Sequence, residues 1–259
     1  MPGCARTSHQ SSLATVYTPE EREDVRAGLL KRAHVDARVT GAALTGSAAL
    51  GKDDRWSDVD VFLGIDEGAD MGEVLAEWTG AVYADAGAVH HWDVRAGRAL
   101  YRVFLLGSGL QVDIAFTPES DFGARGPSFR TIFGTAVDVP PTEPPAFSDV
   151  AGLGWLGVLH ANAAIGRDMP WQAAYWIGSV RDQTLALACL RLGESPHYSR
   201  GVDRLRADIT APLEETFVRG LEPNELRRAL RTARRCLLEE IGRTDAALAD
   251  RLEAALLGG

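Results

Sequence analysis

Residues 39–65 read VTGAALTGSAALGKDDRWSDVDVFLGI. The short apolar run Val39–Thr45 predicts a strand, and the alternation of acidic and apolar residues over Asp58–Ile65 predicts a second one. Gly46 and Ser47 follow the first strand directly, and ten residues separate Ser47 from the second. The order of strand, glycine-serine pair, connector and acidic strand is the most informative feature of the sequence.

Asp58 and Asp60 stand two residues apart in the second strand. Because side chains alternate between the two faces of a strand, both carboxylates point to the same face, a few ångströms apart. Such a pair is unfavourable unless a cation lies between the carboxylates or one of them stays protonated, and Mg²⁺ prefers carboxylate oxygens. Asp113 lies in a further predicted strand, Leu110–Phe116, that is otherwise apolar around it. If the two acidic strands pair, the three carboxylates converge on a metal site.

The glycine-serine pair predicts the complementary half of the site. Gly46 leaves room for a phosphate to approach the backbone, and Ser47 offers a hydroxyl and an amide where a short helix would begin. Lys52 and Arg55 lie in the connector, where a cation could reach the β- and γ-phosphates of a nucleotide. The alternative for both residues is that they simply belong to a solvated loop. For Lys52 the sequence supports phosphate binding and the solvated loop equally, and for Arg55 it slightly favours the solvated loop.

In this order and spacing, Gly46, Ser47, Asp58, Asp60 and Asp113 resemble the signature of the polymerase-β-type nucleotidyltransferase superfamily, over roughly residues 37–117. The resemblance implies transfer of a nucleoside monophosphate, with ATP or another nucleoside triphosphate as co-substrate. It implies that Ser47 helps to hold the triphosphate, that Asp58 and Asp60 bind two Mg²⁺ ions, and that Asp113 completes the metal site or acts as the base. Each element alone is common in solvated loops and strand edges. Their order and spacing favour the functional interpretation.

The elements around this motif predict a mixed sheet with helices over residues 18–138, the catalytic domain that the resemblance implies. Thr18–Glu21 has the pattern of a helix start, with a capping threonine, a first-turn proline and a glutamate, so a helix is predicted to about His34. Residues 1–17 contain no continuous apolar region and are predicted to be a flexible tail. Further elements are predicted as a helix over Gly68–Ala86 and strands over Val89–Arg95 and Ala99–Leu106.

Four prolines fall between Val139 and Pro145, which predicts a linker over residues 139–147. Beyond it helical periodicity dominates, and residues 148–259 are predicted to form a bundle of about five helices. The predicted first-turn prolines are Pro170, Pro196, Pro212 and Pro223. The whole chain is therefore predicted to be α+β, with an all-α bundle after the sheet domain.

Composition and charge exclude several classes of function. The 259 residues are 46% hydrophobic and 24% charged, which is typical of a globular protein. A formal charge of −9, of which −8 falls in residues 1–146 and −1 in the remainder, disfavours nucleic acid and anionic membranes as partners. No segment approaches the roughly 18 apolar residues of a membrane span. Three scattered cysteines indicate a reduced, cytoplasmic compartment.

A compact catalytic domain followed by a helical bundle of this size is similar to the antibiotic nucleotidyltransferases. In those enzymes AMP is transferred to aminoglycosides or lincosamides that lie between the two domains. The resemblance therefore implies a small-molecule hydroxyl acceptor and a role in antibiotic resistance. The net charge of −8 suits a polycationic aminoglycoside, although metal-site acids and solubility explain part of it. The alternatives are a nucleotidyltransferase-fold toxin or antitoxin, a protein-modifying module, or a non-catalytic nucleotide-binding protein.

Several other conspicuous residues are predicted to be structural. His90, His91 and His160 have no companions at metal-ligand spacing. The aromatic residues of a predicted helix over residues 171–182 are interpreted mostly as core, with a nucleotide contact as the minor alternative. Five arginines between Arg227 and Arg235 share a predicted helix with several leucines and are interpreted as its solvated face.

Overall fold

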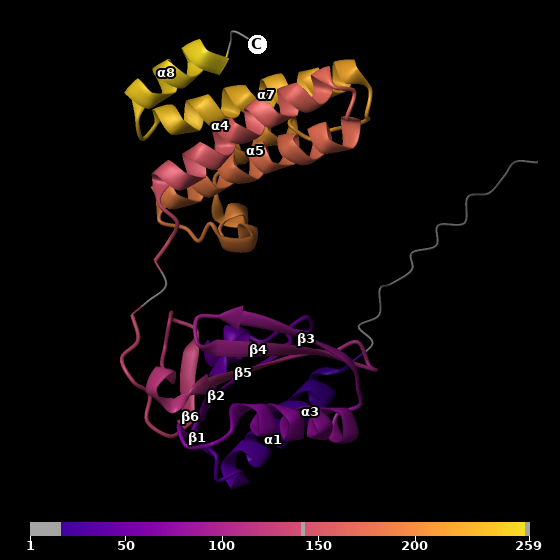
Figure 1. The fold of residues 1–259 in the computed structure, drawn as a ribbon, viewed down its shortest axis with the longest axis vertical. Helices are drawn as coiled ribbons and strands as arrows, with labels where there is room; N and C mark the ends of the chain where they lie inside the picture. Colours follow the sequence, from indigo (N-terminus) through magenta and orange to yellow (C-terminus); the bar gives the residue numbers. More distant parts are fainter. Residues whose placement is uncertain (1–16, 141–142, 257–259) are drawn as a thin grey trace, which may run out of the picture. The chain divides into compact units, whose positions relative to one another are not determined.

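The computed structural model describes residues 17–140 and 143–256, so the predicted tail and Cys4 lie outside the described residues, apart from Tyr17. The chain divides into two compact units, residues 1–142 and 143–259. The first contains a mixed sheet with helices and the second is all α (Figure 1). The protein is therefore α+β, as the sequence predicts.

The first unit is built on one six-stranded sheet with the strand order β3-β4-β5-β2-β1-β6. β2 and β5 are parallel, and all other neighbouring strands are antiparallel. The five predicted strands are confirmed to within two residues at either end. The strands are β1 (Val39–Thr45), β2 (Val59–Ile65), β3 (Ala88–Ala96), β4 (Ala99–Leu106), β5 (Gln111–Pro118) and β6 (Phe129–Phe133).

The edge strand β6 was not expected from the sequence. It has five residues and follows a segment rich in glycine, serine and proline, so it lacks the length that makes alternation recognisable. Pairing with β1 along the sheet, which the sequence does not reveal, is what orders it.

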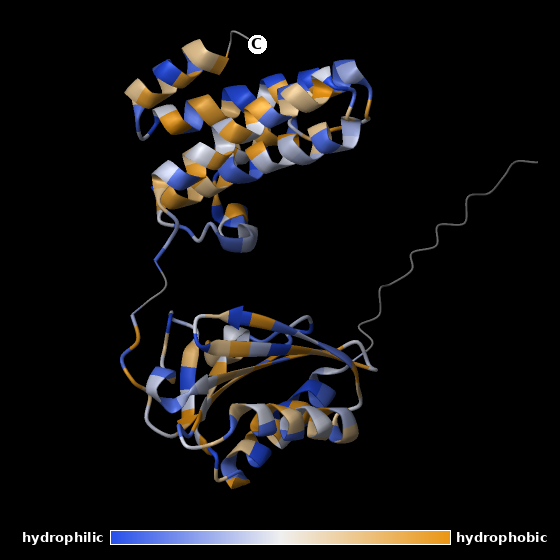
Figure 2. Ribbon diagram, in the orientation of Figure 1, coloured by the Kyte–Doolittle hydropathy of each residue, from blue (hydrophilic) through white to orange (hydrophobic). Residues whose placement is uncertain are grey.

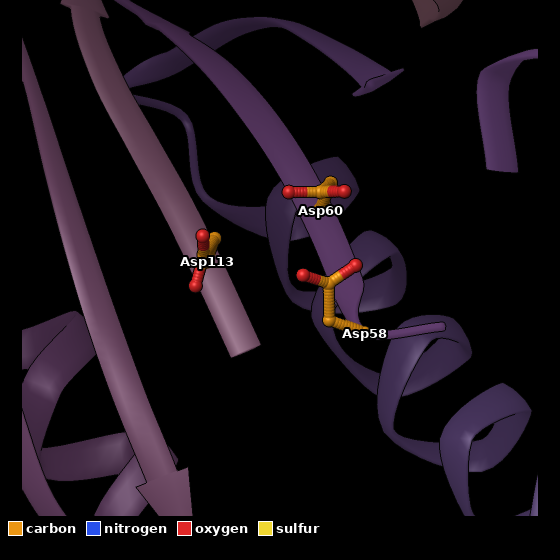
Figure 3. Close-up of side chains that lie close together, drawn as sticks. All are labelled: Asp58, Asp60 and Asp113. Atoms are coloured by element: carbon orange, nitrogen blue, oxygen red, sulfur yellow. The ribbon is translucent and has the colours of Figure 1, made fainter. Parts of the chain in front are cut away.

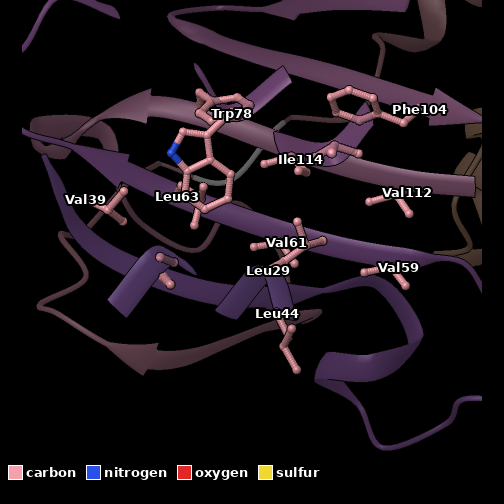
Figure 4. Packing of buried hydrophobic residues seen from close by; sticks show 14 of the residues in the cluster. Leu29, Val39, Leu44, Val59, Val61, Leu63, Trp78, Phe104, Val112 and Ile114 are labelled. Atoms are coloured by element: carbon pink, nitrogen blue, oxygen red, sulfur yellow. The ribbon is translucent and has the colours of Figure 1, made fainter. Parts of the chain in front are cut away.

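Two helices, α1 (Pro19–Val35) and α3 (Met71–Asp85), pack on one face of the sheet. The predicted cap of α1 is confirmed, because the Thr18 side chain accepts a hydrogen bond from the amide of Glu21 at 3.1 Å. The helices and the alternate residues of the central strands enclose the main core of this unit (Figure 4). Among its fully buried members is Trp78, whose ring contacts Phe116 edge to face.

The opposite face of the sheet carries a smaller aromatic cluster around Phe62 and Phe122. Phe122 follows the 3₁₀ turn η1 (Glu119–Asp121) and lies directly on the backbone of two strands. A Cβ atom added to Gly41 or Gly64 would lie 2.6 or 2.9 Å from Phe122, so glycine is needed at both positions. Because strand residues alternate, Asp60 and Asp113 belong to this face and not to the helix-covered one.

The second unit contains five α-helices among its described residues, which confirms the predicted number. Hydrophobic residues form stripes along the helices, with hydrophilic residues between them (Figure 2). Gly154 and Gly157 let α4 approach its neighbours, since added Cβ atoms would lie 2.7 Å from Leu237 and 2.9 Å from Val180. The helices are α4 (Phe147–Gly166), α5 (Pro170–Leu192), α6 (Ala207–Glu214), α7 (Pro223–Gly242) and α8 (Ala246–Leu256). No helix in the described ranges is long and apolar enough to cross a membrane.

The predicted first-turn prolines are confirmed in two of four cases. Pro170 and Pro223 are the first residues of α5 and α7. Pro212 lies inside α6, and Pro196 precedes the short 3₁₀ helix η2 (His197–Ser199), so these two predictions are wrong. Pro212 is the sixth residue of α6, so the helix lacks the hydrogen bond that an amide at this position would donate four residues earlier.

Candidate metal centre

Asp58, Asp60 and Asp113 come together at one end of the β2–β5 pair (Figure 3). Asp60 lies directly opposite Asp113 in the parallel register, and Asp58 comes immediately before β2 instead of inside it. One carboxylate oxygen from each residue lies within 4.8 Å of the others, and all three residues are half-buried. The convergence that the spacing predicted is therefore present.

The register that joins the acids is fixed by their apolar neighbours. Val59 and Val61 alternate with the acids on β2, and Val112 and Ile114 do so on β5. All four are buried in the core beneath α1 and α3. A slip of one residue would place carboxylates in that core and valines on the other face, so the pattern of alternation positions the acids.

The electrostatic state of Asp113 shows how crowded the site is. Burial, together with the nearby charge of Asp58, raises the pKa of Asp113, and a hydrogen bond from Gln111 partly offsets the rise. Gln111 Nε2 donates to the two oxygens of Asp113 at 3.0 and 3.2 Å and lies 3.5 Å from Asp58 Oδ2. Sequence reasoning missed Gln111, although its position two residues before Asp113 places it on the same face.

The donor set fits a hard divalent cation. Three carboxylates offer only oxygen ligands, which Mg²⁺ prefers, and a cation among them would remove their mutual repulsion. Asp58, Asp60 and Asp113 are therefore the residues that could hold a metal.

Gly46 lies against one of the three acids, and its predicted contact with a phosphate stays a prediction. It lies at φ +61°, in the left-handed region, and a Cβ atom added there would lie 2.0 Å from Asp60 Oδ2. Antiparallel pairing of Leu44 with Val61 brings this turn beside the start of β2. The absence of a side chain at Gly46 therefore leaves room for the carboxylate of Asp60.

Ser47 follows Gly46 in the short helix α2 (Gly46–Ala49), and its side chain is engaged within the protein. Ser47 Oγ donates to Asp53 Oδ1 at 2.6 Å, and Arg26 Nη2 donates to Asp53 Oδ2 at 2.7 Å. Burial disfavours the charged form of Asp53, but the bonds from Ser47 and Arg26 outweigh burial and lower its pKa. The site thus includes a chain of contacts from α1 to the glycine-serine turn.

Arg22 and Arg26 fasten the connector between the glycine-serine turn and Asp58 onto α1. Both are buried, with exposed fractions of 4% and 8%. Arg22 Nη1 donates to the backbone oxygen of Asp54 and lies 3.4 Å from that of Ser57. Sequence reasoning missed both arginines, because their spacing on a helix with charged neighbours is typical of a solvated face.

Lys52 and Arg55, the predicted phosphate-binding cations, are exposed. The Arg55 guanidinium lies 4.1 Å from the centre of the Trp56 ring. Among the described residues, neither cation is seen to contact Asp58 or Asp113. Their binding of phosphate stays a prediction.

The other singled-out side chains divide between packing and exposure. His91 is hydrogen-bonded to Tyr83 at 3.0 Å, and His160 stacks on Trp176 with ring centres 4.6 Å apart, which agrees with structural roles. Trp171 and Tyr175, by contrast, have exposed fractions of 77% and 68%. Their interpretation as core is wrong, because both occupy the outer side of α5.

Comparisons with known proteins give a resemblance among solved structures. No protein-family model matches the sequence, and no curated protein sequence matches it. Among solved structures, the chain is similar to the crystal structure of an aminoglycoside 6-adenyltransferase from Bacillus subtilis, with 13% identity and a TM-score of 0.41. The match covers 92% of this chain and 97% of that chain. At this identity the chemistry of the site has to be inferred from its own residues.

Proposed function

We propose that this chain is a Mg²⁺-dependent nucleotidyltransferase, with residues 18–138 as its catalytic domain. In this proposal it transfers AMP from ATP to a hydroxyl group of a small molecule of the aminoglycoside or lincosamide type. The observation that carries the proposal is the in-register pairing of Asp60 with Asp113, with Asp58 beside them. Three acids on one sheet face, next to a glycine-serine turn, suit the handling of a nucleoside triphosphate.

Asp58, Asp60 and Asp113 are the proposed ligands of two Mg²⁺ ions. When bound, such ions neutralise phosphate charge and stabilise the attacking and departing oxygens of an in-line displacement. The protein's contribution is to hold three carboxylates in a half-buried position, where their repulsion in the absence of a cation favours metal binding.

Asp113 is the proposed proton acceptor. The acceptor hydroxyl oxygen forms a bond to the α-phosphorus, the bond from that phosphorus to the oxygen that bridges to the β-phosphate breaks, and pyrophosphate departs with the electron pair. The hydroxyl proton passes to Asp113. Burial raises the pKa of Asp113 in the metal-free site, and a bound Mg²⁺ ion would lower it again, so the proposed role as base depends on the position of Asp113 beside Asp58 and Asp60.

Ser47, Lys52 and Arg55 are the proposed phosphate contacts. The Ser47 hydroxyl has one hydrogen, which it donates to Asp53. Donation to a phosphate oxygen therefore requires the hydroxyl to turn away from Asp53, and Asp53 sets its starting orientation. Lys52 and Arg55 are exposed in the connector beside the glycine-serine turn, where their charges can reach the β- and γ-phosphates.

The test is release of pyrophosphate from ATP, with and without Mg²⁺, in the presence of a panel of aminoglycosides and lincosamides. Mass spectrometry then identifies the acceptor that gains AMP. Asp58→Asn and Asp60→Asn are expected to abolish transfer and to leave the unfolding temperature nearly unchanged. Asp85→Asn is the matched control, because Asp85 is an exposed acid at the end of α3, and it is expected to retain full activity.

The outcomes separate the alternatives. Substantial transfer by Asp60→Asn would contradict the metal assignment. Mg²⁺-dependent binding of ATP without transfer to any small molecule or protein would indicate a non-catalytic nucleotide-binding protein. AMP found on a protein, and on none of the antibiotics, would indicate a protein-modifying or toxin–antitoxin role for the same acids.

A further inference from the structure

Five arginines lie on α7, and the structure divides them into two groups. Arg228 is held by Glu225 at 2.7 Å, and Arg235 by Glu239 at 2.9 Å. The remaining three, Arg227, Arg231 and Arg234, are spaced so that they share one side of the helix. All three line one cavity of the bundle. Arg227 and Arg231 are exposed, as the interpretation of the run as a solvated face expects, and together with the half-buried Arg234 they also border this cavity.

The cavity lies where α7 meets α4 and α8, and it has a volume of about 430 Å³. That volume is in the range of small-molecule sites in proteins, roughly 300–1,000 Å³. Its walls combine apolar side chains with one side-chain amide and the three guanidinium groups. The lining residues other than arginine include Val158, Leu159, Asn162, Leu230 and Leu256.

The arginines of this cavity are not held in ion pairs with any described residue. Within residues 143–256, neither Arg227 nor Arg231 forms an ion pair, and Arg234 donates from Nη1 to the backbone oxygen of Leu256 at 2.7 Å. No acidic residue lines the cavity among the described residues. Arg231 and Arg234 also line a neighbouring cavity, which contains the acids Glu239, Asp250 and Glu253, whereas Arg227 lines only the cavity without acids.

Three like charges on one helix face repel one another unless an anion lies between them. Guanidinium groups match phosphate oxygens with paired hydrogen bonds, which favours phosphate over other anions. The apolar wall from α4 and α8 offers contact to a ligand portion that is not charged. An organic phosphate meets both demands, whereas inorganic phosphate meets only the first.

We propose that the cavity lined by Arg227, Arg231 and Arg234 binds a small organic phosphate, with the phosphate groups on the arginines and the organic portion against Val158, Leu159 and Leu256. The proposed site uses residues of the second unit alone. It requires no metal and is independent of the carboxylate centre and of the function proposed for it.

The experiment is calorimetric titration of the full chain with ADP, in the presence of EDTA so that no metal-dependent site contributes. Saturable binding at one site is expected. Arg227→Gln and Arg231→Gln are each expected to weaken it about tenfold or more, because each removes a charged hydrogen-bond donor. Arg235→Gln is the matched control, since Arg235 is exposed on the same helix but paired with Glu239. This variant is expected to bind ADP within about twofold of the natural chain.

A second probe tests the apolar wall. Pyrophosphate lacks an organic portion and is expected to bind more weakly than ADP, and equal or tighter binding would overturn that part of the proposal. Absence of saturable ADP binding at millimolar concentration overturns the site itself. Equal weakening by Arg235→Gln and Arg231→Gln also overturns it, because only the general charge of α7 would then matter. Arg227 and Arg231 are exposed, so their variants are expected to fold, which circular dichroism verifies.

Discussion

Substitution of Gly46 by alanine should disable the carboxylate centre without removing any of its acids. The added Cβ atom would lie 2.0 Å from Asp60 Oδ2, against about 3.4 Å for ordinary van der Waals contact. The difference, 3.4 − 2.0 = 1.4 Å, is the least distance by which Asp60 or the turn has to move. A displacement of about 1 Å in a reacting group costs on the order of 10²-fold in rate. We therefore expect Gly46→Ala to lose about 100-fold in transfer and to bind Mn²⁺ more weakly.

Gly51 provides the matched control. It lies just after α2 at φ +63°, almost the same backbone conformation as Gly46, but nothing lies within 4 Å of an added Cβ atom. Both alanine variants therefore incur the same left-handed strain, about 1–2 kcal/mol in the free energy of unfolding. Only Gly46→Ala also displaces Asp60.

The assay pairs Mn²⁺ titration, followed by electron paramagnetic resonance, with release of pyrophosphate from ATP. Gly51→Ala is expected to lower the unfolding temperature while it retains the affinity for Mn²⁺ and the rate. If Gly46→Ala kept the Mn²⁺ affinity and the transfer rate of the unsubstituted protein, the reasoning would be refuted, because Asp60 would then not need the space beside Gly46. The metal titration does not depend on the identity of the acceptor, so it tests the geometry even if no acceptor is found.

Three further predictions concern stability. Asp53→Ala leaves the buried Arg26 without one of its partners and is expected to lower the free energy of unfolding in urea by about 1–3 kcal/mol. A loss below about 0.5 kcal/mol would contradict the contact between Arg26 and Asp53. Hydrogen bonds from Arg38 lower the pKa of Asp36 to about 2, so its charged form stabilises the fold fully above pH ~5 and progressively less as the pH falls towards 2. Asp36→Asn is therefore expected to cost about 2 kcal/mol at pH 7 and about half of that at pH 3 by calorimetry, and a cost that does not change with pH would refute the linkage. Gly154→Ala places a Cβ atom 2.7 Å from a leucine of α7 and is expected to lower the free energy of unfolding by about 1–3 kcal/mol. Gly152→Ala on the same helix, with no closer contact than 4.0 Å, is expected to stabilise the fold. Equal effects of the two variants would contradict the packing.

The arrangement of the three acids could be predicted from the sequence because it depends on local periodicity. Asp58 and Asp60 share a face by the alternation of strand residues, and the apolar residues between them fix which face is buried. The remaining condition, that the strand of Asp113 pairs beside β2, follows from one parallel contact. Because the residues alternate with period two and only one pairing of strands has to be assumed, few other arrangements of the three acids are possible.

The contacts of the connector could not be predicted, because they depend on partners distant in sequence. Arg26 meets Asp53 from 27 residues away, and Arg22 reaches the connector from 32. Nothing in the spacing of the α1 arginines distinguishes burial from exposure. The close approach of Asp60 to Gly46 could not be predicted for the same reason, since Asp60 lies on the next strand.

The burial of Arg22 and Arg26 indicates that α1 serves the site as well as the core. The Nε atoms of both side chains are buried without a hydrogen-bond partner, and such a group costs about 1–3 kcal/mol. Apolar residues at these positions would cover the sheet without that cost, and replacement of buried ion pairs by apolar residues is often neutral or stabilising. What the arginines provide instead is a fixed connector, because they hold the backbone at Asp54 and the carboxylate of Asp53. That connector leads directly into Asp58, so the polar contacts of α1 determine where the first of the three acids lies.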